Sequence, residues 1–261
     1  MKFGGDRRSV VALVVFFIGL LSGNIGAEPL NIAVAANFNT CAKSLTRTFE
    51  RETALSTRLL FASTGALYAQ IYAGAPFDVF LAADAARPAA AIKAKLALKE
   101  SLLTYAIGRL ALYSESLDSA DGLAALESDN GARIAIANPT TAPYGRAALA
   151  MLGRRYEWLR SSGRLILGTN VAQAFSFVAS GNAEFGLIAL AQVGHLERRH
   201  YWPVPADRHP PIVQQAVLLS ASTNEVAARK FLRFLGSAQA RDLIRAHGYD
   251  VPRQDTGITT P

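Results

Sequence analysis

Four short stretches of the chain place uncharged hydrogen-bond donors between an apolar run and a helical pattern. These stretches contain Asn37, Ser63 with Thr64, Tyr144 with Gly145, and Thr169 to Val171. A helix start of this kind directs free backbone N–H groups and the positive end of the helix dipole at one spot, which suits an anion. None of the four carries a carboxylate. One such turn alone is explained at least as well by an ordinary capped helix, so the hypothesis depends on the repetition.

Each stretch needs a strand before it and a helix after it, and the first half of the chain supplies both. Apolar residues at 30–35 and at 58–62 predict two buried strands. Asn37 is predicted to cap the helix that follows the first strand. Gly65 follows the second strand, where it lets the backbone approach a ligand closely.

The second half repeats this arrangement. Residues 133–137 and 164–167 predict two further strands, each running into a turn and a helix. Pro143 has no N–H group and presets its turn, so that the N–H groups of Tyr144 and Gly145 point forward at the helix start. We therefore expect two donor turns in each half of the chain.

Two longer β-like runs connect the halves. Residues 104–113, interrupted by Gly108, form a candidate hinge strand, and residues 212–219 form a strand that returns to the first half. Strands alternate with helices throughout, which predicts an α/β fold. In open α/β sheets ligands bind beyond the carboxyl ends of strands. Two lobes would bring all four turns to one cleft and hold a ligand from both sides.

Charged residues near these turns receive other interpretations. Asp78 and Asp84 flank a predicted buried strand at 79–81. Residues six apart on a strand lie about 20 Å apart, so the two do not form a catalytic pair. We interpret Asp84 as a helix cap and Asp78 as a strand-edge residue. Arg146 is a candidate counter-charge for an anion, although a residue one turn into a helix more often faces solvent.

The N-terminus has the pattern of a secretory signal over residues 1–27. A basic start precedes an apolar core at 10–21, and the small residue Ala27 suits a signal peptidase. The core is too short to span a bilayer comfortably. We expect cleavage after Ala27 and export to a bacterial periplasm. Cys41 is the single cysteine, so no internal disulfide is possible, and we interpret it as a packing residue.

Composition argues against other classes of function. The formal charge is +7 for the whole sequence and about +5 without the signal, spread along the chain rather than clustered as in nucleic-acid-binding proteins. The four histidines are scattered without metal-ligand spacing, and no nucleophile motif surrounds Ser63. We expect no enzyme activity, no cofactor, no metal-ion ligands and no nucleic-acid partner.

Several fragments, in their order and spacing, give the mature chain a specific resemblance over nearly its whole length. The fragments are Ala35-Ala36-Asn37-Phe38, Ser63-Thr64-Gly65-Ala66-Leu67-Tyr68-Ala69-Gln70-Ile71, Gly74-Ala75-Pro76-Phe77-Asp78-Val79-Phe80, Thr104-Tyr105-Ala106-Ile107-Gly108, Ala137-Asn138-Pro139, Ala142-Pro143-Tyr144-Gly145, Asn170-Val171-Ala172-Gln173-Ala174 and Pro211-Ile212-Val213-Gln214. With these fragments the chain resembles the family of periplasmic molybdate-binding proteins that serve bacterial ABC importers.

The resemblance implies a type II periplasmic binding protein fold with a ligand cleft between two lobes. Lobe 1 would be discontinuous, 28–107 plus 216–261, and lobe 2 would be 108–215. The expected function is capture of molybdate, and of tungstate, for delivery to an inner-membrane ABC permease. We expect the protein to be a monomer. The alternative is a binding protein for another small oxyanion such as sulfate.

The resemblance also implies the binding residues and two departures. It assigns the oxyanion to Asn37, to Thr64 with Ser63 beside it, and to the backbones of Tyr144 and Val171. Some members have Ser where Asn37 stands, so this chain resembles the Asn-bearing branch. Some use a Tyr hydroxyl where this chain has Ala189. The site therefore has fewer side-chain donors, or another group compensates.

Overall fold

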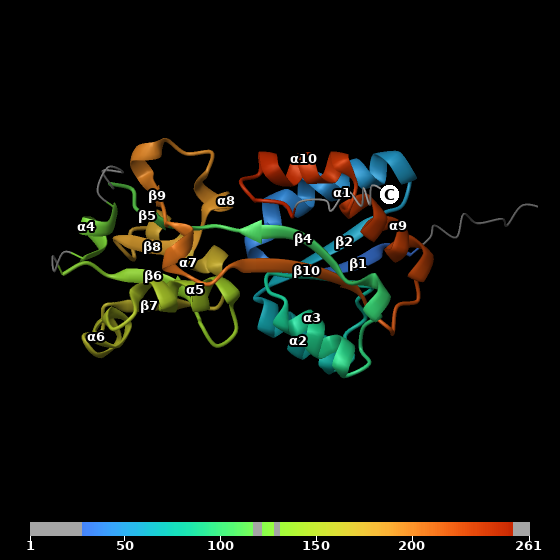
Figure 1. The fold of residues 1–261 in the computed structure, drawn as a ribbon, viewed down its shortest axis with the longest axis horizontal. Helices are drawn as coiled ribbons and strands as arrows, with labels where there is room; N and C mark the ends of the chain where they lie inside the picture. The colour runs from blue at the N-terminus through green and yellow to red at the C-terminus, as the bar shows by residue number, and fades with distance from the viewer. Residues whose placement is uncertain (1–27, 117–121, 128–130, 253–261) are drawn as a thin grey trace, which may run out of the picture.

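Two five-stranded sheets, each covered by helices, form two lobes that lie side by side (Figure 1). The computed structural model describes residues 28–116, 122–127 and 131–252. The predicted signal and its cleavage site after Ala27 lie outside these residues. The architecture confirms the predicted α/β class with two lobes.

The first sheet has the strand order β2-β1-β3-β10-β4. Its strands are β1 (Leu30–Ala35), β2 (Thr57–Ala62), β3 (Val79–Ala82), β4 (Leu103–Gly108) and β10 (Ile212–Leu218). β1 pairs in parallel with β2 and β3, whereas β10 is antiparallel to both of its neighbours. The parallel carboxyl ends of these three strands therefore share one edge.

Helices cover both faces of this sheet. α1 (Asn39–Thr53), α9 (Glu225–Leu235) and α10 (Ala238–Ala246) lie on one face, and α2 (Thr64–Tyr72) and α3 (Ala86–Lys93) lie on the other (Figure 1). Two short 3-10 helices, η1 (Ala36–Phe38) and η2 (Lys99–Ser101), complete the lobe. Apolar residues fill the space on each side, with Phe49 and Phe231 edge to face on the first.

The second sheet has the order β7-β6-β8-β5-β9. Its strands are β5 (Leu110–Tyr113), β6 (Ile134–Ala137), β7 (Leu165–Gly168), β8 (Phe185–Ala189) and β9 (Tyr201–Pro203). The helices of this lobe are α4 (Gly122–Glu127), α5 (Pro143–Leu152), α6 (Arg155–Ser161), α7 (Val171–Ala179) and α8 (Leu190–Val193), with the 3-10 helices η4 (Arg198–His200) and η5 (Ala206–Arg208). β6 pairs in parallel with β7 and β8.

Two neighbouring segments cross between the lobes. Only Arg109 separates β4 of the first sheet from β5 of the second, which confirms that the 104–113 run crosses. β10 returns to the first sheet, and Ile212 already pairs with Gly108 at its edge. The lobe boundaries at 107/108 and 215/216 stay a prediction, although β10 itself begins at Ile212.

The lobes are in contact at their facing ends. Ala35 and Ala83 of the first lobe pack into the hydrophobic core of the second, beside Ala142 and Tyr144. Gly65 N donates to Thr141 O across the interface at 2.8 Å. The structure is therefore a closed arrangement of the lobes. Within the described part of the chain, no helix has both the length and the apolar character that a membrane span requires.

Candidate anion-binding site

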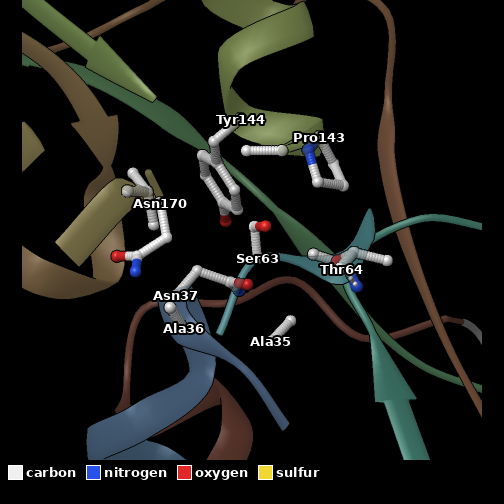
Figure 2. A pocket seen from close by; sticks show the side chains of 11 residues that line it. Ala35, Ala36, Asn37, Ser63, Thr64, Pro143, Tyr144 and Asn170 are labelled. Atoms are coloured by element: carbon white, nitrogen blue, oxygen red, sulfur yellow. Dashed lines mark hydrogen bonds between the residues drawn. The ribbon is translucent and has the colours of Figure 1, made fainter. Parts of the chain in front are cut away.

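A small cavity lies between the lobes, where helices from both sides begin (Figure 2). The cavity is lined by Ala35, Ala36, Asn37, Ser63, Thr64, Ala83, Ala142, Pro143, Tyr144, Asn170 and Val171. All five predicted ligand-binding residues are among them. The centre of a water-sized sphere has only about 10 Å³ of this cavity to move in, whereas pockets for drug-sized molecules occupy about 300–1,000 Å³, so the cavity suits a much smaller ligand.

At the start of α2, both hydroxyl groups already accept a hydrogen bond from the backbone. Ser63 caps the helix and its Oγ accepts from Ala66 N at 3.4 Å. Thr64 Oγ1 accepts from Ala83 N at 3.0 Å, and both side chains are buried. A hydroxyl carries one proton as well as its acceptor lone pairs. Each of these two protons therefore remains available for a ligand.

The helix starts of the second lobe leave a few N–H groups free. In α5 the first backbone bond runs from Arg146 N to Ala142 O, so the N–H groups of Tyr144 and Gly145 have no partner within the helix. A Cβ at Gly145 would collide with Ala137 O. Glycine is thus required for α5 to begin this close to the end of β6.

At the start of α7 one backbone N–H group stays free, because the N-cap residue Asn170 accepts hydrogen bonds from two others. Asn170 Oδ1 accepts from Ala172 N at 2.9 Å and from Gln173 N at 3.1 Å. Ala174 N donates to the Asn170 carbonyl. Of the first four N–H groups of this helix, only that of Val171 remains, and Val171 lines the cavity.

Asn37 does not cap α1, so that prediction was wrong. It lies in η1, ahead of α1, and no side-chain cap is formed. Its Nδ2 instead donates to Gln214 Oε1 at 2.9 Å and to Tyr249 Oη at 3.3 Å. These distant partners hold the amide away from the helix N–H groups. The backbone N–H of Asn37 precedes the first helical bond and has no intrahelical partner.

Asn37 belongs to a buried polar cluster that the sequence reasoning missed. Gln214 Oε1 also accepts from Tyr105 Oη at 3.1 Å, and Tyr249 Oη donates to Asn37 O at 2.7 Å. Burial raises the pKa of Tyr105 and of Tyr249, so both hydroxyls keep their protons. The signal available was the pair of adjacent glutamines, Gln214 and Gln215, in the otherwise apolar strand β10.

Charged side chains lie outside the cavity lining and pair with one another. Arg146 Nη2 contacts Asp84 Oδ2 at 2.7 Å across the interface, so this arginine neither lines the cavity nor simply faces solvent. Asp84 accepts from Arg87 N at 2.9 Å and so bonds an N–H group in the first turn of α3, although the N-cap position itself is Ala85. Arg87 also donates to Thr140 O of the other lobe at 3.2 Å. These contacts hold the closed arrangement.

Two other predicted positions have structural roles. Asp78 accepts from Asn31 N at 2.7 Å and from Ser222 Oγ at 2.6 Å, as expected of a strand-edge residue. Ala189 is fully buried at the start of α8 and does not line the cavity. Cys41 is buried in the core, and burial raises the pKa of its thiol. Among the described residues, no cluster of His, Cys, Asp or Glu could hold a metal ion.

Comparisons with known proteins agree on one family. The family model for bacterial extracellular solute-binding proteins matches residues 30–250. The chain is 39% identical over 246 residues to the molybdate-binding protein ModA of Azotobacter vinelandii, covering 93% of this chain and 96% of that protein. It is 39% identical over 248 residues to ModA of Rhodobacter capsulatus, covering 95% and 98%.

A solved structure extends this similarity to the fold. The periplasmic molybdate-binding protein of Azotobacter vinelandii superposes with a TM-score of 0.81 at 34% identity, covering 86% of this chain and all of that chain. This likeness confirms the type II periplasmic binding protein fold. Membership of a solute-binding family also agrees with the expectation that the chain is not an enzyme. The chain therefore belongs to the bacterial extracellular solute-binding proteins, in the family that includes ModA.

Proposed function

We propose that this protein captures molybdate, and also tungstate, in the periplasm and delivers it to an ABC permease of the inner membrane. One observation carries the proposal: the predicted ligand residues from both lobes line a single small cavity that holds hydrogen-bond donors and no charged side chain. The ligand named for the relatives with 39% identity supports the choice of oxyanion.

The proposed ligand contacts come from both lobes. The first lobe contributes the backbone N–H of Asn37 and the hydroxyls of Ser63 and Thr64. The second lobe contributes the backbone N–H groups of Tyr144 and Val171. Helix dipoles add positive potential at the same spot without any cationic side chain.

The magnitude of these contacts suits tight capture. A hydrogen bond to a charged partner contributes roughly 1.5–3 kcal/mol. Five such bonds, less the costs of desolvation and of ordering the lobes, are compatible with affinities from micromolar to nanomolar, about −8 to −12 kcal/mol. A ligand held from both lobes also stabilises the closed arrangement relative to the open one. The closed arrangement is the state that a permease would recognise.

A titration of four oxyanions tests the proposal. Calorimetry on the chain beginning at residue 28 should give tight one-to-one binding of molybdate and tungstate, and much weaker binding of sulfate and phosphate. The absence of heat with both metal oxyanions would refute the proposal. Tight binding of sulfate alone would establish the other small-oxyanion function instead.

Export and assembly have their own tests. Expression of the full sequence in a bacterium should yield a periplasmic protein whose mass corresponds to cleavage after Ala27. Sedimentation should show a monomer. An inner-membrane ABC permease, reconstituted with the protein, should hydrolyse ATP faster when the protein carries molybdate than when it does not.

A further inference from the structure

The phenol of Tyr144 lies at the cavity without a partner. Its side chain lines the cavity, and only 1% of the residue is exposed. Its hydroxyl points toward the space beside Ser63 and Asn37 (Figure 2). Among the described residues, no group forms a hydrogen bond with Tyr144 Oη. A buried hydroxyl without a partner is costly, so an occupant of the cavity is expected to satisfy it.

The surroundings of the phenol determine which kind of occupant fits. Gly108 makes room for it, because a Cβ at that position would overlap Tyr144 Oη and lie 2.9 Å from Gln214 Nε2. Gln214 Nε2 is also buried without a partner, and an amide nitrogen only donates. The phenol oxygen is therefore placed to accept from Gln214, and its own proton is left for another acceptor.

The electrostatics of the phenol agree with this assignment. Burial raises the pKa of Tyr144, and the nearby amide groups of Asn37 and Gln214 partly oppose that shift. Neighbours that lower a phenol pKa do so by directing donors at its oxygen. The net effect leaves the hydroxyl protonated at neutral pH, with its proton directed away from those donors.

We propose that the Tyr144 hydroxyl donates a further hydrogen bond to the bound oxyanion, beside the backbone N–H of the same residue. This inference rests on the proposed function. It identifies the group that compensates for Ala189, where some relatives carry a tyrosine hydroxyl. The replacement comes from the start of α5 rather than from the end of β8, so the same chemical group approaches the ligand from another element.

Tyr144→Phe tests the inference because it removes one oxygen and keeps the ring and the backbone N–H. The dissociation constant for tungstate, measured by calorimetry, should rise roughly 10- to 100-fold. Tyr113→Phe is the matched control. Tyr113 is a buried tyrosine of the same lobe whose hydroxyl is bonded to Glu115, away from the cavity, and its loss should leave the affinity unchanged.

A spectroscopic measurement separates ligand contact from packing. Saturating tungstate should produce a near-ultraviolet tyrosine difference band in the natural protein and in Tyr113→Phe, and this band should be missing from Tyr144→Phe. Natural affinity in folded Tyr144→Phe would overturn the inference. The inference would also be overturned if Tyr144→Phe bound tungstate weakly but the natural protein gave no difference band on binding. The absence of the band from the natural protein decides the matter even if Tyr144→Phe does not fold. If the natural protein binds no oxyanion, the proposed function itself fails.

Discussion

Thr64 offers the sharpest test of the proposed contacts, because its hydroxyl has two separable tasks. It accepts from Ala83 N at 3.0 Å within the first lobe, and its proton is free for the ligand. Thr64 is 1% exposed, so water does not replace either bond. Thr64→Val keeps the branched shape of the side chain and replaces the hydroxyl with a methyl group.

The two tasks predict two effects of similar size in different measurements. Loss of a donor to a charged ligand should cost roughly 1.5–3 kcal/mol of binding, which is about a 10- to 150-fold rise in the dissociation constant. The buried N–H of Ala83 loses its acceptor, which should lower the free energy of unfolding by about 1–3 kcal/mol in the ligand-free protein. Calorimetry with molybdate measures the first effect and urea unfolding measures the second.

Thr64→Ser is the control because it retains the hydroxyl and loses one methyl group, worth about 0.8 kcal/mol of burial. It should bind molybdate with nearly natural affinity. If Thr64→Val loses stability but binds as tightly as the natural protein, the hydroxyl serves only Ala83 and the assignment of Thr64 to the ligand is wrong. A loss of affinity that Thr64→Ser shows equally would point to the shape of the side chain instead.

Three further predictions concern charge and pH. Arg146→Gln removes the interlobe pair with Asp84, worth about 0.2–1 kcal/mol at this exposure, so calorimetry should show at most about a five-fold loss of affinity, smaller in high salt. Molybdate affinity should change less than about two-fold between pH 6 and 8, because no carboxylate or histidine lines the cavity and burial raises the pKa of Tyr144; a steep dependence would implicate a titrating group. The Arg133 guanidinium lowers the pKa of Glu184 from 4.5 to about 2, so this pair stabilises the fold above about pH 4.5 and the contribution is lost as the pH falls toward 2. Glu184→Gln should remove this acid-dependent contribution to the free energy of unfolding, which is under about 1 kcal/mol because both side chains are half exposed. If the reasoning is wrong, the acid unfolding curves of the two proteins will coincide.

Local sequence patterns were sufficient to predict the strand–turn–helix units and the run at 104–113 that crosses between the lobes. An apolar run, a turn residue and a helical repeat lie within about a dozen residues, so their physical causes are all visible together. The role of Asn37 was not accessible in this way. Its side-chain partners Gln214 and Tyr249 are 177 and 212 positions away, and they prevail over the capping that local pattern predicts.

The same limit explains the interpretation of Arg146. From the sequence, an arginine one turn into a helix faces either an anion or solvent. The closed lobes bring it to Asp84, 62 positions away, and that pairing removes the positive charge from the site. The turns that line the cavity followed from local pattern, whereas the side-chain partners of Asn37 and of Arg146 depend on tertiary contacts.

Hydrogen bonds within each lobe give the cavity its chemical character, because side-chain oxygens at the helix starts accept from backbone N–H groups. Ser63 and Thr64 each accept from a backbone N–H, and that bond leaves each hydroxyl proton free to donate to a ligand. Asn170 consumes two N–H groups of α7 and leaves that of Val171. An oxyanion whose oxygens all accept satisfies every one of these groups, whereas a protonated oxyanion would direct an O–H at a donor. Discrimination against protonated oxyanions such as phosphate therefore requires no charged residue, because the N–H groups can only donate and each hydroxyl already accepts one hydrogen bond.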